Sequence, residues 1–284
     1  MSETDVLAVP VLSEELFGQF RALIQQQTGI CMRESKKLLV SNRVRKRMRQ
    51  LGILSFQDYY DLITGNPGAE LPRFIDAVTT NETYFYRGES HFAVLRRVVL
   101  PQLLGRRDRV VVWSVGCSSG EEAYTLAIEG LEAVGPGREQ RFEVLATDIS
   151  TTVIAQAQAG VYNGRTLRFL PGAMLAAHFE RTAGGDYRVR DDVRRRVRFA
   201  VHNALADEPL VRPVDVIFCR NMMIYFDMPT QSRLVDERFA RVLAPDGYLF
   251  IGHSESLIGK STRFSYSRID HTPVYRLAAA KESA

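Results

Sequence analysis

The chain has 284 residues, of which 45% are hydrophobic and 25% are charged. These proportions are typical of a globular protein and exclude disorder over most of the chain. No apolar run approaches the roughly 18 to 20 residues that a membrane-spanning helix needs. We expect no secretory signal, because the first residues are acidic and lack a basic stretch. Cys31, Cys117 and Cys219 lie far apart, which argues against a disulfide framework and a metal site.

Helical periodicity dominates the first 75 or so residues. One predicted helix follows an N-cap at Ser13, and a second spans 35–51 and stops at Gly52. A third follows Ser55 and closes with a turn over 65–68, and a fourth begins near Glu70. We therefore predict an all-helical domain over residues 1–78.

Short apolar runs alternate with helical segments after about residue 108. The predicted strands span 109–114, 142–148, 197–202, 214–219 and 247–252. Of the predicted helices, one spans 121–134, one begins near residue 150 and one spans 231–243. This alternation is typical of a doubly wound α/β sheet, which we place in residues 109–284. Two segments near 264–266 and 273–277 are predicted to form a closing hairpin.

Residues 162–196 interrupt the alternation. Polar and apolar residues alternate over 186–190 and 196–199, with Asp191 and Asp192 as a turn between them. We therefore predict a small antiparallel β insertion built on this hairpin. Residues 79–108 are predicted to be a linker with a ligand-binding segment.

The loop after the first predicted strand has the layout of a nucleotide-type site. Small residues over 115–120 let a ligand approach the backbone, and the helix that follows begins with Glu121 and Glu122. These two acids would repel a phosphate, which favours a ligand with positive charge or hydroxyls, such as S-adenosylmethionine. On this loop alone, a plain tight turn explains the pattern equally well.

Polar side chains also follow other predicted strands. Asp148 ends the second strand, where an acid can accept hydrogen bonds from ribose hydroxyls or cap the next helix. Arg220, Asn221 and Tyr225 follow the fourth strand and face the ligand crevice of such a sheet, or else form a helix cap and a core aromatic. Upstream, Arg87 can hold a ligand carboxylate.

A family resemblance rests on six motifs, TTNETYFYR, VWSVGCSSGEEAY, ATDIS, HNAL, FCRNMMIYFD and GHSE. Together they resemble the chemotaxis receptor methyltransferases of the CheR family over nearly the whole chain. The resemblance implies a class I S-adenosylmethionine-dependent methyltransferase with a Rossmann-like seven-stranded sheet, its last strand antiparallel. It also implies methyl transfer to glutamate side chains on the cytoplasmic helices of chemoreceptors, with S-adenosylhomocysteine as the product. The implied location is the cytoplasm, with recruitment to receptor arrays.

The resemblance also assigns roles to residues. Its cofactor-binding positions fall here on Asn81, Thr83, Arg87, Glu121, Asp148, Asn203, Ala204, Arg220 and Asn221. Arg87 would pair with the methionine carboxylate and Asp148 would hold the ribose. Asn203 and Ala204 would border the adenine, and Ala204 stands where relatives often have leucine. We predict Arg220 and Tyr225 as catalytic residues that line the glutamate pocket.

The chemistry of this reaction needs no general base. A glutamate carboxylate is already ionised at neutral pH, because its reference pKa is about 4.3. Catalysis is then mostly positioning of oxygen, methyl and sulfur. We therefore expect no direct role for His202 or His253.

One predicted helix is unusually basic. Its cations are Lys36, Lys37, Arg43, Arg45, Lys46, Arg47 and Arg49, and its predicted apolar stripe is Val40, Val44, Met48 and Leu51. We expect Arg45, Lys46 and Arg49 to project to solvent on the opposite side. An ordinary solvated face or a nucleic-acid surface would explain the charge. We favour docking on acidic receptor helices through Arg43, Arg45, Lys46 and Arg49.

Other functions compete with receptor methylation. A nucleic-acid methyltransferase would prefer an Asn/Asp-Pro-Pro-aromatic motif after the fourth strand, where this chain has Arg220 to Met223, so we expect no nucleic-acid partner. A sensor that binds S-adenosylmethionine without catalysis stays open. In some members of the family that this chain resembles, the β insertion binds a receptor C-terminal pentapeptide. The predicted turn over 181–187 is short beside theirs, which argues against such binding here.

Overall fold

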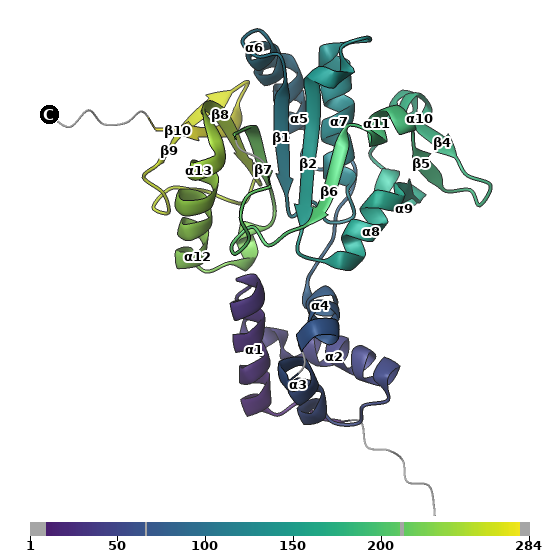
Figure 1. Cartoon of the computed structure of the whole chain (residues 1–284), viewed down its shortest axis with the longest axis vertical. Coiled ribbons are helices and arrows are strands. Elements are labelled where there is room, and N and C mark those ends of the chain that lie inside the picture. Colours follow the sequence, from purple (N-terminus) through teal and green to yellow (C-terminus); the bar gives the residue numbers. More distant parts are fainter. Residues whose placement is uncertain (1–9, 66, 211–212, 279–284) are drawn as a thin grey trace, which may run out of the picture. The chain divides into compact units, whose positions relative to one another are not determined.

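The computed structural model describes residues 10–65, 67–210 and 213–278. The chain divides into two compact units, Met1–Thr80 and Asn81–Ala284 (Figure 1). Within the described ranges, helices long and apolar enough to cross a membrane are absent. The domain boundaries that the sequence predicts at residues 78 and 108 stay predictions.

The N-terminal unit is helical, as predicted. Its elements are α1 (Glu14–Thr28), the 3-10 turn η1 (Glu34–Lys36), α2 (Lys37–Leu51), α3 (Phe56–Gly65) and α4 (Pro67–Val78). Ser13 caps α1, since its Oγ accepts a hydrogen bond from Leu16 N at 3.1 Å. Gly52 ends α2 in the left-handed conformation, with φ of 70°. Both predicted helix ends are confirmed.

The predicted turn over 65–68 is wrong in part. Asn66 lies outside the described residues, and Pro67 and Gly68 already belong to α4. The fixed φ of proline suits the first position of a helix, which explains the earlier start. Phe17, Phe20, Tyr59 and Phe74 then fill the core of this unit.

The second unit contains a doubly wound sheet. Among the described residues it has seven strands in the order β6-β2-β1-β7-β8-β10-β9 (Figure 1). Their bounds are β1 (Val110–Val115), β2 (Phe142–Asp148), β6 (Val197–Val201), β7 (Val214–Cys219), β8 (Leu243–Ile251), β9 (Phe264–Ile269) and β10 (Thr272–Leu277). β10 runs antiparallel to β8 and β9, while β6, β2, β1, β7 and β8 are parallel. The predicted strands and the closing hairpin are confirmed.

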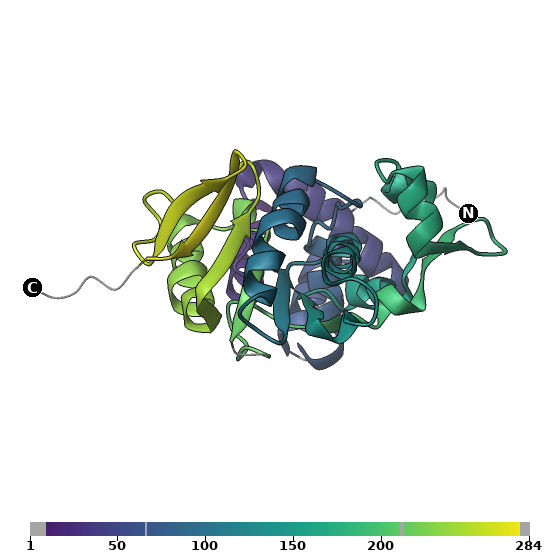
Figure 2. The ribbon, with the colours of Figure 1, turned by 90° about the horizontal axis from the view of Figure 1, so that it is seen from above.

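Helices cover both faces of this sheet (Figures 1 and 2). Outside the insertion, the helical elements of this part of the chain are α5 (Glu89–Val94), the π-helix η2 (Leu95–Val99), α6 (Leu100–Leu104), α7 (Glu121–Val134), η3 (Glu139–Arg141), α8 (Thr151–Ala159), η4 (Met223–Tyr225), α12 (Met228–Arg233), the π-helix η5 (Leu234–Phe239) and α13 (Ala240–Val242). The bounds of α7 match the prediction. Gly130 lets α7 lie close to β2, because a Cβ there would collide with the ring of Phe142.

The insertion is antiparallel, as predicted, but its pairing differs. It is a small sheet of β3 (Val161–Tyr162), β5 (Tyr187–Val189) and β4 (Phe179–Arg181), with β5 in the middle, and it includes α9 (Gly164–Leu167) and α10 (Gly172–His178). Figure 2 shows it beyond one edge of the main sheet, opposite the β9–β10 hairpin.

The hairpin predicted between 186–190 and 196–199 is wrong. Asp191 and Asp192 begin the short helix α11 (Asp191–Arg194), where acids suit the N-terminus. The segment after it is β6, which pairs in parallel with β2. Alternation marks a strand but does not identify its partner.

Candidate active site

The loop after β1 is tied to the end of β2. Gly116 N and Cys117 N both donate to Thr147 O, at 2.8 and 2.9 Å. Gly116 has φ of 70°, and a Cβ there would lie 2.8 Å from Met222 Sδ. Glycine is therefore required for both the backbone conformation and the packing against the segment after β7.

Asp148 connects this loop to the start of α8. Its Oδ2 accepts from Ser118 N at 2.9 Å and its Oδ1 accepts from Ser150 N at 3.0 Å. Ser118 Oγ in turn donates to Asn81 O at 2.9 Å. The cap of α8 is Ser150, whose Oγ accepts from Val153 N at 3.3 Å. The N-cap of α8 is therefore Ser150 and not Asp148, whose carboxylate binds both the β1 loop and Ser150 N.

The two glutamates of α7 lie in different surroundings. Glu121 is buried and accepts from Ser119 Oγ at 2.7 Å, and burial raises its pKa. Glu122 accepts from Ser114 Oγ at 2.7 Å and from Arg220 Nη1 at 3.1 Å. Burial raises the pKa of Glu122, against the opposing effect of the Arg220 guanidinium.

Arg220 joins three separate segments of this unit. Its Nη1 binds Glu122 at the start of α7, and its Nη2 donates to the carbonyl oxygen of Arg87. Its guanidinium lies over the ring of Phe92, 5.1 Å from the centroid. Its Nε is buried and has no hydrogen-bond partner among the described residues.

The segment before α5 carries other predicted cofactor residues. Arg87 is half-buried, and its Nη1 donates to Glu82 O at 2.9 Å. Its guanidinium lies 5.8 Å from the ring centroid of Tyr84. Thr83 is half-buried beside them. The backbone contact between Arg87 and Arg220 brings this segment to the end of β7.

The turn after β7 presents Asn221 and Tyr225. Asn221 adopts the left-handed conformation, with φ of 57°. Tyr225 ends η4 and is half-buried, so it is not a core aromatic. The cap of α12 is Asp227, whose Oδ1 accepts from Thr230 N at 2.9 Å. The structure therefore removes both alternative interpretations of Asn221 and Tyr225.

Asn203 and Ala204 follow β6 at the same edge of the sheet. Asn203 N donates to Asp207 Oδ2 at 2.7 Å, and Asn203 Oδ1 accepts from Leu205 N at 3.0 Å. The carbonyl oxygen of Ala204 accepts from Arg238 Nε at 3.2 Å. These bonds hold the loop and leave both residues half-buried.

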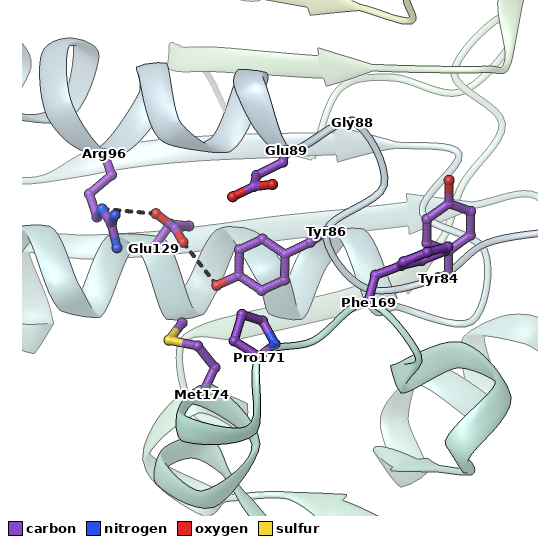
Figure 3. A pocket seen from close by; sticks show the side chains of 9 residues that line it. All are labelled: Tyr84, Tyr86, Gly88, Glu89, Arg96, Glu129, Phe169, Pro171 and Met174. Carbon is purple, nitrogen blue, oxygen red and sulfur yellow. Dashed lines mark hydrogen bonds and ion pairs between the residues drawn. The ribbon is translucent and has the colours of Figure 1, made fainter.

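A cavity of about 440 Å³ is lined in part by the segment that leads into α5 (Figure 3). Its lining residues are Tyr84, Tyr86, Gly88, Glu89, Arg96, Glu129, Phe169, Pro171 and Met174. Glu129 Oε1 accepts from the Tyr86 hydroxyl at 2.9 Å, and Arg96 Nε lies 3.2 Å from Glu129 Oε2. Burial raises the pKa of both Tyr86 and Glu129. Sequence reasoning missed Glu129, although an acid seven residues after Glu122 shares its helix face.

The histidines near the site contact other groups of the protein. His202 is buried, and its Nε2 lies 3.1 Å from Glu208 O. His253 is exposed and stacks on His91, with ring centroids 4.6 Å apart. Both ring nitrogens of His91 are buried without a hydrogen-bond partner among the described residues.

His91 is expected to make stability depend on pH. Burial, together with the charge of Arg220, lowers its pKa to about 3, so the unfolded chain binds an extra proton below its ordinary pKa of about 6.5. Folding stability due to this group is therefore complete above pH 6.5 and falls as the pH drops. Relative to His91→Phe, the wild-type chain should lose about 2 kcal/mol between pH 7.5 and pH 5. Urea denaturation of both chains at both pH values measures this, and a difference independent of pH would contradict it.

The basic helix α2 uses some of its cations internally. Arg43 Nη1 donates to Val78 O at 2.6 Å and Thr79 O at 2.8 Å, where it caps the end of α4. Arg45 Nε donates to Pro10 O at 3.0 Å, and its guanidinium lies 5.6 Å from the ring centroid of Phe56. The prediction that Arg45 projects freely to solvent is therefore wrong.

The predicted apolar stripe of α2 is largely confirmed. Val40, Val44 and Met48 are buried, whereas Leu51 is 39% exposed and does not belong to the stripe. Lys46 and Arg49 are exposed. Of the three cations predicted to project to solvent, these two do so, from the middle and end of α2.

Comparison with known proteins gives matches along most of the chain. A family model described as CheR methyltransferase, SAM binding domain matches residues 81–272, and one described as CheR methyltransferase, all-alpha domain matches residues 15–79. The chemotaxis protein methyltransferase of Klebsiella aerogenes is 42% identical over 250 residues, which cover 86% of this chain and 84% of that protein. Chemotaxis protein methyltransferase 2 of Pseudomonas aeruginosa is 39% identical over 253 residues, covering 88% and 89%. The chemotaxis protein methyltransferase of Escherichia coli K12 is 38% identical over 261 residues, covering 89% and 88%.

Proposed function

Because the chain belongs to the CheR methyltransferase family and uses S-adenosylmethionine as methyl donor, we propose that it methylates specific glutamate side chains on the cytoplasmic helices of chemoreceptors. The products would be glutamate methyl esters and S-adenosylhomocysteine, and the reaction would serve sensory adaptation. We propose that it acts in the cytoplasm at receptor arrays. The seven-stranded sheet with β10 antiparallel is the class I methyltransferase fold.

The residues at the strand ends fit S-adenosylmethionine. The loop after β1 leads to Glu121 at the start of α7 and is bound by Asp148 at the end of β2, so acids stand here instead of the cations that a phosphate would need. The buried Nε of Arg220 is an unpartnered donor in the same region. We propose that Arg87 binds the methionine carboxylate, Asp148 the ribose, and Asn203 with Ala204 the adenine. Asn81, Thr83, Glu121, Arg220 and Asn221 complete the proposed cofactor set.

The proposed mechanism relies on positioning. When bound, S-adenosylmethionine supplies a methyl group already activated by its sulfonium. The acceptor carboxylate is ionised at neutral pH, so the chain needs no base to deprotonate it. We propose that Arg220 attracts and orients this carboxylate, and that Tyr225 lines the same pocket with its hydroxyl. Alignment and exclusion of water then provide the rate enhancement.

The observation that carries the proposal is a pair of hydrogen-bond networks at the carboxyl edge of the sheet. One links Asp148, Ser118 and Asn81, and the other links Glu122, Arg220 and Arg87. The test is incubation with methyl-labelled S-adenosylmethionine and a panel of receptor cytoplasmic fragments, followed by alkaline release of methanol. Base-labile label on the receptor supports a carboxyl methyl ester. Base-stable label, label on added nucleic acid, or cofactor binding without transfer would each reject the proposal.

Receptor docking is expected to depend on Lys46 and Arg49. Their exposed charges can attract an acidic receptor helix over a distance that salt limits to about 10 Å at 0.1 M. The double variant Lys46→Glu/Arg49→Glu should slow receptor methylation about tenfold at low salt and less at high salt. Cofactor affinity measured by calorimetry should not change.

The matched control reverses two exposed cations of the other unit, in Arg97→Glu/Arg138→Glu. It has the same change in net charge and should keep most of the methylation rate. Equal slowing by both double variants would point to net charge alone and remove α2 as the docking surface.

We propose that the enzyme works without a receptor tether. The turn between β4 and β5 is short and closed, because Thr182 N donates to Asp186 O at 2.8 Å and Gly185 N donates to Thr182 O at 3.0 Å. Titration with a receptor C-terminal pentapeptide tests this. Micromolar binding would overturn it.

A further inference from the structure

The carboxylate of Glu255 holds together the ends of two neighbouring strands. Its Oε2 accepts from Gly252 N at 2.6 Å, just after β8, and from Asn221 N at 3.0 Å, just after β7. Its Oε1 accepts from Ile224 N at 3.2 Å. Backbone amides thus satisfy both carboxylate oxygens, and hydrogen bonds to an ionised acceptor are the stronger kind.

The backbone around Glu255 is shaped for this contact. A Cβ at Gly252 would lie 2.7 Å from Glu255 Oε2 and 3.0 Å from Asn221 N, so only glycine lets the carboxylate approach both segments. Glu255 N also donates to Gly252 O at 2.9 Å, which closes a turn. Asn221 has φ of 57°, a conformation that a non-glycine residue keeps only when its surroundings hold it. The hydrogen bond from the backbone N–H of Asn221 to Glu255 restrains it in this conformation.

We propose that Glu255 is a positioning residue for methyl transfer. Through the amide of Asn221 it fixes a residue of the proposed cofactor set, and through the amide of Ile224 it fixes the 3-10 turn that presents Tyr225. The inference rests on the proposed function, because it assigns Glu255 to that same site. Its negative charge would otherwise repel a carboxylate substrate, and the amide donors that surround it offset that charge.

The two carboxylate oxygens can be tested separately. In Glu255→Gln the side chain keeps its shape, and the remaining oxygen can serve Gly252 and Asn221 while the amide NH₂ faces Ile224 N. This variant loses the bond that positions Tyr225, so kcat should fall about tenfold while the dissociation constant of S-adenosylmethionine changes less than about threefold. Glu255→Ala loses all three bonds, and both kcat and cofactor affinity should fall at least about tenfold.

The control is Glu237→Gln, which removes the same charge from an exposed glutamate of η5 and should keep wild-type kcat. Amide NMR gives a second measurement, because the Ile224 proton should shift upfield in Glu255→Gln while the Asn221 proton keeps its position. Wild-type kcat in Glu255→Gln, or equal losses of kcat and cofactor affinity in that variant, overturns the inference. If the wild-type chain itself forms no base-labile ester on any receptor fragment, the proposed function fails first.

Discussion

Replacing Arg220 with methionine is expected to lower the free energy of unfolding by about 3–5 kcal/mol. The side chains of Arg220 and Glu122 are only 2% and 14% exposed, so the variant leaves the Glu122 carboxylate buried without its counter-charge. The contact between Arg220 and the backbone of Arg87 is lost as well. Urea denaturation at pH 7, followed by the fluorescence of Trp113 in β1, reports on this unit because the chain has one tryptophan.

A double variant isolates the effect of the unpaired charge. Glu122→Gln/Arg220→Met removes both charges and should regain part of the loss, because no ion is then left buried. Arg138→Met removes an exposed arginine and should change stability by less than about 0.5 kcal/mol. If the double variant were no more stable than Arg220→Met, the unpaired charge of Glu122 would not be the cause of the lost stability.

The strands of the sheet were readable from the sequence because they are buried on both sides. β2 and β7 are mostly apolar and almost entirely buried, and their bounds match the prediction. Residues 89–104 form a helical segment that we read only as a linker. Phe92, Leu95, Val99 and Leu103 recur there at helical spacing and are buried, so the signal was present.

The sequence indicates where the residues of the site lie, but not which groups they bind. Strand ends in an open α/β sheet mark the ligand crevice, which pointed to Asp148 and Arg220. The groups that bind them, Ser118 N and Glu122, come from the loop and helix after β1, and no local pattern pairs them. The same limit applies to α2, where the charge run did not reveal that Arg43 binds the end of α4.

Substitution of Asp148 by alanine is expected to weaken S-adenosylmethionine binding at least about a hundredfold. The carboxylate is proposed to bind the ribose, and it also accepts from Ser118 N, which shapes the loop after β1. Each hydrogen bond to a charged group contributes about 1.5–3 kcal/mol, and 1.4 kcal/mol is a tenfold change in affinity. Losing the proposed bonds to both ribose hydroxyls therefore lowers affinity by more than a hundredfold, and isothermal calorimetry measures it directly.

Asp148→Asn separates the two roles of this carboxylate. The amide keeps one acceptor oxygen, which can stay on Ser118 N, so the loop should survive. Its NH₂ then faces Ser150 N, so the bond to Ser150 is lost together with one proposed ribose bond. Affinity should then fall about tenfold, between wild type and Asp148→Ala. Asp186→Asn, an exposed aspartate of the insertion, serves as the control and should bind with wild-type affinity. Unchanged affinity in Asp148→Ala would remove this residue from the cofactor site and leave it only the role of joining the β1 loop to α8.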